Sequence, residues 1–161
     1  MIDTKIFAHR GSAGTHPENT MVSFEEAVRA GADGIELDVQ LSRDGELVVI
    51  HDEKLDRTTN GTGYVKDLTL RELKGLDASY TFKGKTGPEK IPALHEVLEL
   101  FTQNNMLLNI ELKNGVFMYE GMEEKVIELV HAYSLQDRVI LSSFNHYSLV
   151  RVFQLAPHME T

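Results

Sequence analysis

The chain has 161 residues, which is enough for one domain with a buried core and too few for two. Its 25 acidic and 16 basic residues give a formal net charge of −9, and the basic residues are scattered singly, so we expect no nucleic-acid partner. The absence of cysteine excludes disulfides, thiolate metal sites and cysteine nucleophiles. The sequence has no apolar run of membrane-spanning length and no signal-peptide pattern, which predicts no membrane span and a cytoplasmic location.

Apolar, β-branched runs alternate with segments of helical periodicity, which is typical of an α/β protein. Gly31 is expected to end the first helix, and Asn145 to cap the last one. In chain order, we expect a strand at residues 5–9, a helix at 19–30, strands at 34–39 and 46–51, a helix after Pro92, a strand at 106–112, a helix at 119–133, a strand at 138–143 and a final helix that ends before Pro157.

The predicted strands at 34–39 and 46–51 lie too close together in the sequence for a crossover helix between them. Only residues 42–45 separate them, and Asp44-Gly45 favours a hairpin turn. We therefore expect the two strands to pair antiparallel, as an irregularity in a parallel barrel. The same turn is expected to place residue 51 directly opposite residue 38, on the same face.

The segment from residue 52 to residue 92 is rich in glycine and resembles a loop. Inside it, Thr69 and Glu72 form a capping box for one short helix, which Gly75 is expected to stop. A loop of this length inside a compact domain usually carries function. We expect this segment, called the insertion below, to lie over the mouth of a site.

Three carboxylates fall on strands that should otherwise be apolar. Alternation along a strand places Glu36 and Asp38 on one face and Leu37 on the other. Like charges this close are costly unless a cation holds them, although a solvent-facing edge strand would give the same pattern. Glu111 supplies a third inward carboxylate, and three oxygen ligands without soft ones suit Mg²⁺ or Ca²⁺.

Two histidines differ from the others because each closes an apolar strand beside a charged residue. These are His9, followed by Arg10, and His51, followed by Asp52. A histidine pair can act as base and acid because the ordinary pKa of imidazole lies near neutrality. Arg10 and Lys113 would supply fixed positive charge for an anionic substrate. Together with the carboxylates, these residues form a set suited to phosphodiester hydrolysis.

Short motifs follow one another along almost the whole chain. They are His9-Arg10-Gly11, Pro17-Glu18-Asn19-Thr20, Glu36-Leu37-Asp38-Val39, Asp44-Gly45, His51-Asp52, Leu55 to Gly61, Ile91 to Leu94, Asn109 to Lys113 and Ser142-Ser143-Phe144. In this order and spacing they resemble the motifs of the glycerophosphodiester phosphodiesterase family. The resemblance implies an α/β fold of the (β/α)8 TIM-barrel type with its site at the carboxyl ends of the strands. It also implies metal-dependent hydrolysis of small-molecule glycerophosphodiesters to sn-glycerol 3-phosphate and an alcohol.

The resemblance assigns a role to each candidate residue. His9 and His51 are the acid–base pair. Arg10 and Lys113 bind the phosphate of the substrate. The ligands of a divalent metal, Mg²⁺ or Ca²⁺, are Glu36, Asp38 and Glu111.

The length of the chain departs from that of a complete barrel, which takes about 250 residues. We expect residues 1–161 to form a single partial catalytic barrel that stops after its fifth strand and the following helix, with the insertion at about 52–92. Open barrel edges favour self-association, because their backbone groups are unpaired.

Three alternatives remain open at this point. A related phospholipase would use the same histidines and carboxylates on phosphoinositides or sphingolipids. A glycosidase with Glu36 and Glu111 as its carboxylate pair would leave the two histidines, Arg10 and Lys113 unexplained. A non-catalytic partial barrel that only binds a ligand is favoured solely by the missing strands.

Overall fold

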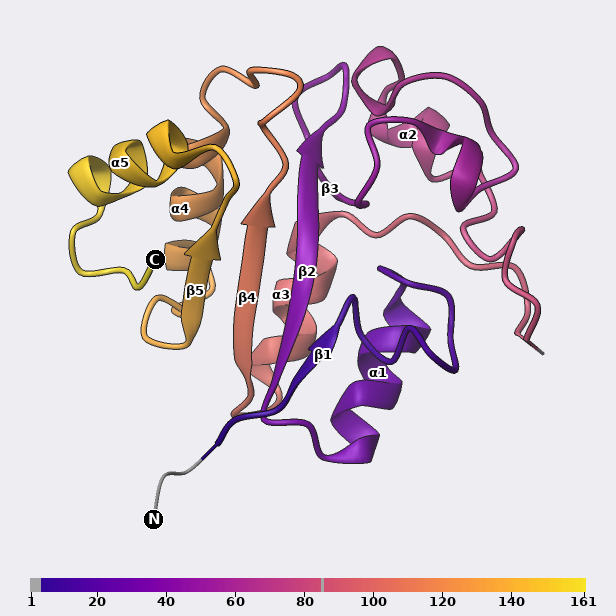
Figure 1. The fold of residues 1–161 in the computed structure, drawn as a ribbon, viewed down its shortest axis with the longest axis horizontal. Helices are drawn as coiled ribbons and strands as arrows, with labels where there is room; N and C mark the ends of the chain where they lie inside the picture. The colour runs from indigo at the N-terminus through magenta and orange to yellow at the C-terminus, as the bar shows by residue number, and fades with distance from the viewer. Residues whose placement is uncertain (1–3, 85) are drawn as a thin grey trace.

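The computed structural model describes residues 4–84 and 86–161. Five strands in this part of the chain form one sheet, and four of them are parallel neighbours (Figure 1). Their order is β1 (Phe7–His9), β2 (Gly34–Leu41), β4 (Leu107–Leu112) and β5 (Val139–Ser142). The helices between and after them are α1 (Met21–Ala30), α3 (Leu94–Thr102), α4 (Met122–Ala132) and α5 (His146–Leu155). Every predicted strand and helix is present, with ends that differ by a few residues.

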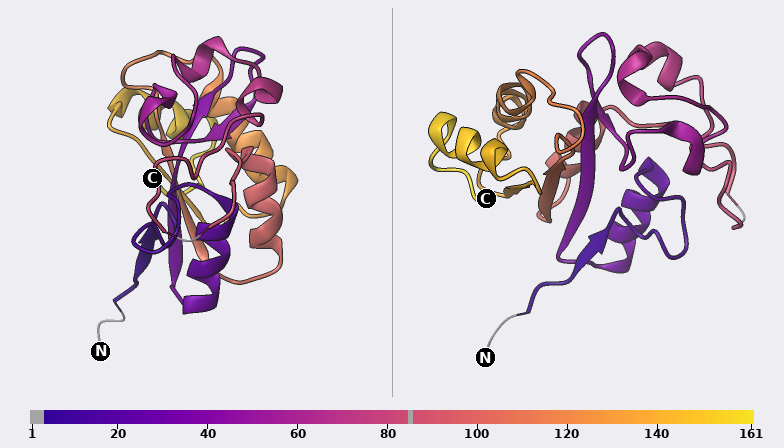
Figure 2. Two further views of the ribbon diagram at one scale, coloured as in Figure 1. Left: turned by 90° about the vertical axis from the view of Figure 1, so that its right-hand side faces the viewer. Right: turned by 45° about the horizontal axis from the view of Figure 1, so that its top comes forward.

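One face of the sheet carries the main hydrophobic core. Apolar side chains of α1, α3 and α4 pack there against residues of the strands, among them Leu37 and Ile110. The turned view in Figure 2 places α3 and α4 together on one side of the strands. Because side chains alternate along a strand, the neighbours of these apolar residues project from the opposite face. That second face carries the polar side chains of β2 and β4.

The ends of α1 illustrate how single residues set the helix boundaries. Gly31 ends the helix as predicted, at a φ of 76°, and its N–H bonds to the carbonyl oxygens of Ala27 and Val28. The helix begins at Met21 rather than at residue 19, because Asn19 has a φ of 54° and Thr20 is extended. Residues 19 and 20 therefore belong to the loop that follows β1.

The predicted antiparallel hairpin is confirmed, but its register differs by one residue. In β3 (Leu47–Val49), Val49 lies opposite Val39, and the Ile50 N–H bonds to the Asp38 carbonyl oxygen at 3.0 Å. Residue 50, and not residue 51, therefore faces residue 38, so the expected register was wrong. The cause is the turn, which has three residues instead of two: the Ser42 N–H bonds to Glu46, and Gly45 takes a φ of 78°.

The insertion is more ordered than a loop. It contains two short 3-10 helices, η1 (Leu55–Arg57) and η2 (Val65–Asp67), and α2 (Leu70–Leu73), which starts with the predicted Thr69–Glu72 capping box. α2 ends two residues before Gly75. A separate apolar cluster joins the insertion to the end of the hairpin; its buried members are Val48, Ile50, Leu55, Val65, Leu73, Ala78 and Ile91. Figure 1 shows α2 beside the carboxyl end of β2, the end at which the site was expected.

The chain after α5 returns to the outer edge of β5. The Leu141 N–H bonds to the Glu160 carbonyl oxygen at 2.9 Å, in a single parallel bridge that pairs Ile140 with Glu160. No pattern in the sequence predicts this contact. Within residues 4–84 and 86–161, no helix has the length and apolar character needed to cross a membrane.

Candidate active site

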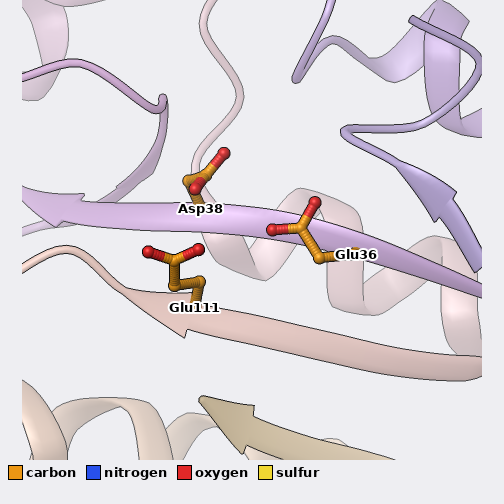
Figure 3. Close-up of side chains that lie close together, drawn as sticks. All are labelled: Glu36, Asp38 and Glu111. Atoms are coloured by element: carbon orange, nitrogen blue, oxygen red, sulfur yellow. The ribbon is translucent and has the colours of Figure 1, made fainter. Parts of the chain in front are cut away.

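Glu36, Asp38 and Glu111 converge on the polar face of β2 and β4 (Figure 3). Each offers an oxygen within 4.8 Å of an oxygen of the other two. Alternation along β2 aligns Glu36 with Asp38, and the parallel register with β4 pairs Asp38 with Glu111. We call these three residues the carboxylate cluster. As expected from the sequence, its members point toward one another, at separations over which one cation can contact all three.

Asp38 is fully buried and only half satisfied by its neighbours. Its Oδ2 accepts a hydrogen bond of 2.9 Å from the Asn19 side chain and lies 3.3 Å from the Arg10 Nε. Its Oδ1 is buried and has no hydrogen-bond partner among the described residues. The Lys113 Nζ lies 3.9 Å from this oxygen. A buried carboxylate oxygen without a donor is costly, and a bound cation would remove that cost.

The cluster also alters the acidity of Glu36. Burial raises the pKa of Glu36 to about 7, and the negative charges of Asp38 and Glu111 act in the same direction. A hydrogen bond of 3.1 Å from the Arg10 backbone N–H to Glu36 Oε2 opposes this shift without cancelling it. Without a cation, Glu36 therefore keeps its proton to a higher pH than an ordinary glutamate does.

The two predicted histidines lie on either side of the carboxylate cluster. His9 ends β1 opposite Glu36, with its Nε2 3.8 Å from Glu36 Oε2 and 69% of its side chain exposed. His51 follows the hairpin, and its Nε2 lies 3.2 Å from the Lys113 Nζ, which in turn lies 3.0 Å from Glu111 Oε1. His51 therefore lies in the site even though the hairpin register differs by one residue from the expected one. A hydrogen bond of 3.0 Å from the Gln40 side chain to the His51 carbonyl oxygen holds its backbone there.

Arg10 occupies a tight turn between β1 and the next loop. It has a φ of 56°, which is rare for a residue with a long side chain, and Gly11 follows with a φ of 75°. A Cβ at Gly11 would lie 2.4 Å from Ser23 Oγ and 2.8 Å from the Ser23 backbone, so only glycine fits. The Arg10 carbonyl oxygen accepts hydrogen bonds from the Ser23 hydroxyl and the Asn19 N–H, both at 3.1 Å. These contacts hold the guanidinium toward Asp38.

Four further charged or polar residues, which were not among the predicted site residues, belong to the site. Asn19 binds Asp38, and Asp52 Oδ1 lies 2.5 Å from His51 Nδ1. The other two are Glu18, which accepts from Arg10 at 3.0 Å, and Arg57, which contacts both Glu18 and Asp52. All four lie within the motifs quoted from the sequence, which was the only signal that could have identified them.

A hollow of about 200 Å³ opens beside the carboxylate cluster. Glu53, Glu111 and Lys113 form its charged wall, and Val116 and Phe144 contribute apolar side chains from the loops after β4 and β5. It offers space for a small molecule next to the cluster.

Comparison with known proteins gives a consistent result. The model of the glycerophosphoryl diester phosphodiesterase family matches residues 9–161. A glycerophosphodiester phosphodiesterase of Bacillus altitudinis is 58% identical over 158 residues, which are 98% of this chain and 64% of the relative. One of Caldanaerobacter subterraneus is 55% identical over 98% of this chain and 65% of the relative.

Solved structures agree with this result. The crystal structure of a glycerophosphodiester phosphodiesterase from Agrobacterium tumefaciens superposes with a TM-score of 0.88 at 38% identity, over 98% of this chain and 65% of that one. A phosphodiesterase of Oleispira antarctica, solved in complex with the product sn-glycerol-3-phosphate, gives a TM-score of 0.86 at 38% identity over 97% and 64%. The chain thus spans just under two-thirds of the length of these relatives. The predicted fold, part of a TIM barrel, is confirmed, and the chain belongs to the glycerophosphoryl diester phosphodiesterase family.

Proposed function

We propose that this chain provides the catalytic centre of an enzyme that hydrolyses glycerophosphodiesters to sn-glycerol 3-phosphate and an alcohol. Membership of the family supports the reaction class, and the product bound to the Oleispira antarctica relative supports a small glycerophosphate ligand. The observation that carries the proposal is the convergence of three carboxylates, including the half-satisfied Asp38, with two histidines beside them. Residues 1–161 act in this proposal as one partial barrel with the insertion at about 52–92.

The carboxylate cluster is proposed to hold a divalent metal, Mg²⁺ or Ca²⁺. Its donors are all carboxylate oxygens, which these two ions prefer, and Asp38 Oδ1 lacks another partner among the described residues. When bound, such an ion neutralises charge on the phosphate and polarises it. Lys113 and Arg10 leave the cluster with a net negative charge, because three carboxylates face two cations. That excess favours a cation at this position.

The histidines are proposed to move protons at the phosphate. His51 has its Nδ1 against the Asp52 carboxylate, so this nitrogen carries the proton and the Nε2 lone pair faces the site. His9, on the other side of the cluster, is open to solvent and to substrate. One imidazole can accept the proton of the attacking group while the other donates one to the leaving alcohol.

Arg10 and Lys113 are proposed to bind the phosphate oxygens. Both have donors aimed at the polar face, and both lie within 4 Å of Asp38. The hollow beside Glu111 and Lys113 would receive part of the substrate, with Val116 and Phe144 contacting its carbon atoms. In a chain of this net charge, these two cations together with a divalent ion in the cluster would supply the local positive charge that an anionic substrate needs.

The test is release of glycerol 3-phosphate from glycerophosphocholine by the whole protein. We expect turnover with Mg²⁺ or Ca²⁺, loss of turnover in EDTA and recovery when either ion is restored. Sphingomyelin and a phosphoinositide, tested in parallel, address the related phospholipase reaction. A metal-replete, folded protein that releases no glycerol 3-phosphate, or one that is equally active in EDTA, would contradict the proposal.

A further inference from the structure

Arg57 lies on η1 of the insertion and contacts two carboxylates at once. Its Nε and Nη2 donate to the two oxygens of Asp52, at 2.6 Å and 3.1 Å. Its Nη1 and Nη2 donate to the two oxygens of Glu18, at 2.8 Å and 2.7 Å. Both pairings are bidentate, an arrangement that a planar guanidinium makes and a lysine cannot. We call Arg57, Asp52 and Glu18 the arginine network.

Each carboxylate of the arginine network also contacts a residue of the candidate active site. Asp52 Oδ1 lies 2.5 Å from His51 Nδ1, and Glu18 Oε1 lies 3.0 Å from Arg10 Nη1. One guanidinium on the insertion is therefore one carboxylate away from both the proposed acid–base histidine and the proposed phosphate-binding arginine.

The network holds the Asp52 carboxylate in a fixed direction beside the His51 imidazole. The Arg57 guanidinium, followed by the contact with His51, lowers the pKa of Asp52 to about 2. Near neutrality Asp52 would be ionised at its ordinary pKa as well, so what the Arg57 contacts add is a fixed orientation of a carboxylate that can only accept hydrogen bonds. An imidazole facing it must present Nδ1–H, which leaves the Nε2 lone pair toward Lys113 and the site.

The insertion holds Arg57 in a fixed place. Leu55, in the same 3-10 turn, is fully buried in the apolar cluster of the insertion. The Thr81 hydroxyl donates a hydrogen bond of 2.7 Å to the Arg57 carbonyl oxygen. The backbone on which the guanidinium is carried is therefore packed on one side and hydrogen-bonded on the other.

We propose that Arg57 is a positioning residue, which orients His51 through Asp52 and Arg10 through Glu18, so that the insertion sets the geometry of the active site. This inference rests on the proposed function. Stability alone does not account for the arrangement, because the Arg57 side chain is 46% exposed and ion pairs at that exposure contribute little to folding. The two bidentate pairs instead fix the orientation of the Asp52 and Glu18 carboxylates.

The first test compares Arg57→Met with Arg43→Met in the whole protein. Arg43 is a matched control, because it also joins the insertion to the barrel, through Asp67 and Glu72, but contacts no proposed site residue. Partners that orient metal-ligating side chains typically contribute roughly 10- to 100-fold, and we take the same size for a partner that orients a catalytic imidazole. We therefore expect Arg57→Met to lower kcat by about 10- to 100-fold and to raise KM several-fold, while Arg43→Met changes both by less than about threefold. Arg57→Lys, which restores the charge without the fork, should recover only part of kcat.

The second test asks whether Arg57 acts through Asp52. If it does, kcat of the double variant Asp52→Ala/Arg57→Met should lie within about threefold of that of Asp52→Ala, since coupled residues are not additive. The result that overturns the inference is an Arg57→Met protein with normal kcat, or an Arg43→Met protein that loses as much.

A third measurement separates this inference from the proposed function. Nitrogen NMR of the His51 ring, at a pH where the imidazole is neutral, should show the Nδ1–H form in the unmodified protein. In Arg57→Met the Nε2–H form should gain population. This readout needs no turnover, so it decides the role of Arg57 even in a protein that fails to release glycerol 3-phosphate. An unchanged ring in Arg57→Met overturns the inference.

Discussion

The carboxylate cluster and the arginine network are neighbouring groups of acidic residues that differ in how their negative charge is balanced. In the cluster, Glu36, Asp38 and Glu111 face one another with too few cations, and burial raises the pKa of Glu36 to about 7. In the network, the bidentate Arg57 contacts outweigh burial and hold the pKa of Asp52 at about 2. Anions that the chain neutralises by itself serve to position their neighbours. Anions that it leaves in excess create a place for an external cation.

Removing one carboxylate from the cluster should give the largest effect, because it tests directly whether the excess negative charge binds a cation. Asp38→Asn keeps the size of the side chain but deletes a charge at the buried centre, so we expect divalent-ion binding to be lost, and turnover of the whole protein with it. Titration calorimetry with Mg²⁺ and Ca²⁺ measures the binding. Glu128→Gln, at an exposed position on α4, is the control and should bind normally. Undiminished binding by Asp38→Asn would show that the cluster is not the metal site.

The histidines give the next largest expected effect. His9→Ala and His51→Ala should each lower kcat by roughly 10²- to 10⁴-fold, because each removes a proton-transfer group. Neither belongs to the cluster, so ion binding measured by calorimetry should be largely retained. His95→Ala and His131→Ala change exposed helical positions and should leave turnover near normal. If either site variant kept a near-normal rate, that histidine would have no acid–base role.

The cluster could be predicted from the sequence because it depends on local geometry. Alternation on β2 aligns Glu36 with Asp38, and parallel pairing brings the end of β4 alongside. The hairpin register could not be predicted, because Asp44-Gly45 fits both a two-residue and a three-residue turn and only the structure shows the latter.

The arginine network escaped prediction for a different reason. Its contact between Arg57 and Glu18 joins positions 39 residues apart in the chain, through an insertion without regular periodicity. Nothing in the composition of the insertion indicates which of its charged side chains turns toward the barrel. The apolar cluster that fixes its path is likewise composed of single residues scattered over 48–91.

The raised pKa of Glu36 allows the charge excess of the carboxylate cluster to be tested by stability measurements, without any substrate. Its folded-state pKa is raised from 4.5 to about 7, so the folded protein holds this proton more tightly than the unfolded chain does. Without metal, stability should therefore fall as pH rises from about 4.5 to about 7, by an amount on the order of 2–3 kcal/mol. Thermal or urea melts of metal-free protein at pH 5 and pH 7.5 measure this loss. Glu36→Gln should show a smaller loss, and a saturating divalent ion should offset it in the unmodified protein. If stability fell equally with pH in the unmodified protein and in Glu36→Gln, the pKa of Glu36 would not be raised.

The smallest expected effect has the opposite sign and belongs to Asp52. Its folded-state pKa is lowered from 3.8 to about 2, so its contribution to stability is present above about pH 4 and disappears as pH falls toward 2. Because the Asp52 side chain is 27% exposed and its partner Arg57 is 46% exposed, solvent screening limits this contribution to about 1 kcal/mol. Urea melts should find Asp52→Asn less stable than the unmodified protein at pH 5.5, with the gap closing between pH 4 and pH 2.5. Salt at 1 M should also narrow the gap, since it screens a partly exposed ion pair. A stability difference that persists unchanged at low pH would mean that the charge of the Asp52 carboxylate does not stabilise the fold. The arginine network would then not be a site of neutralised negative charge, and its contrast with the carboxylate cluster would be wrong.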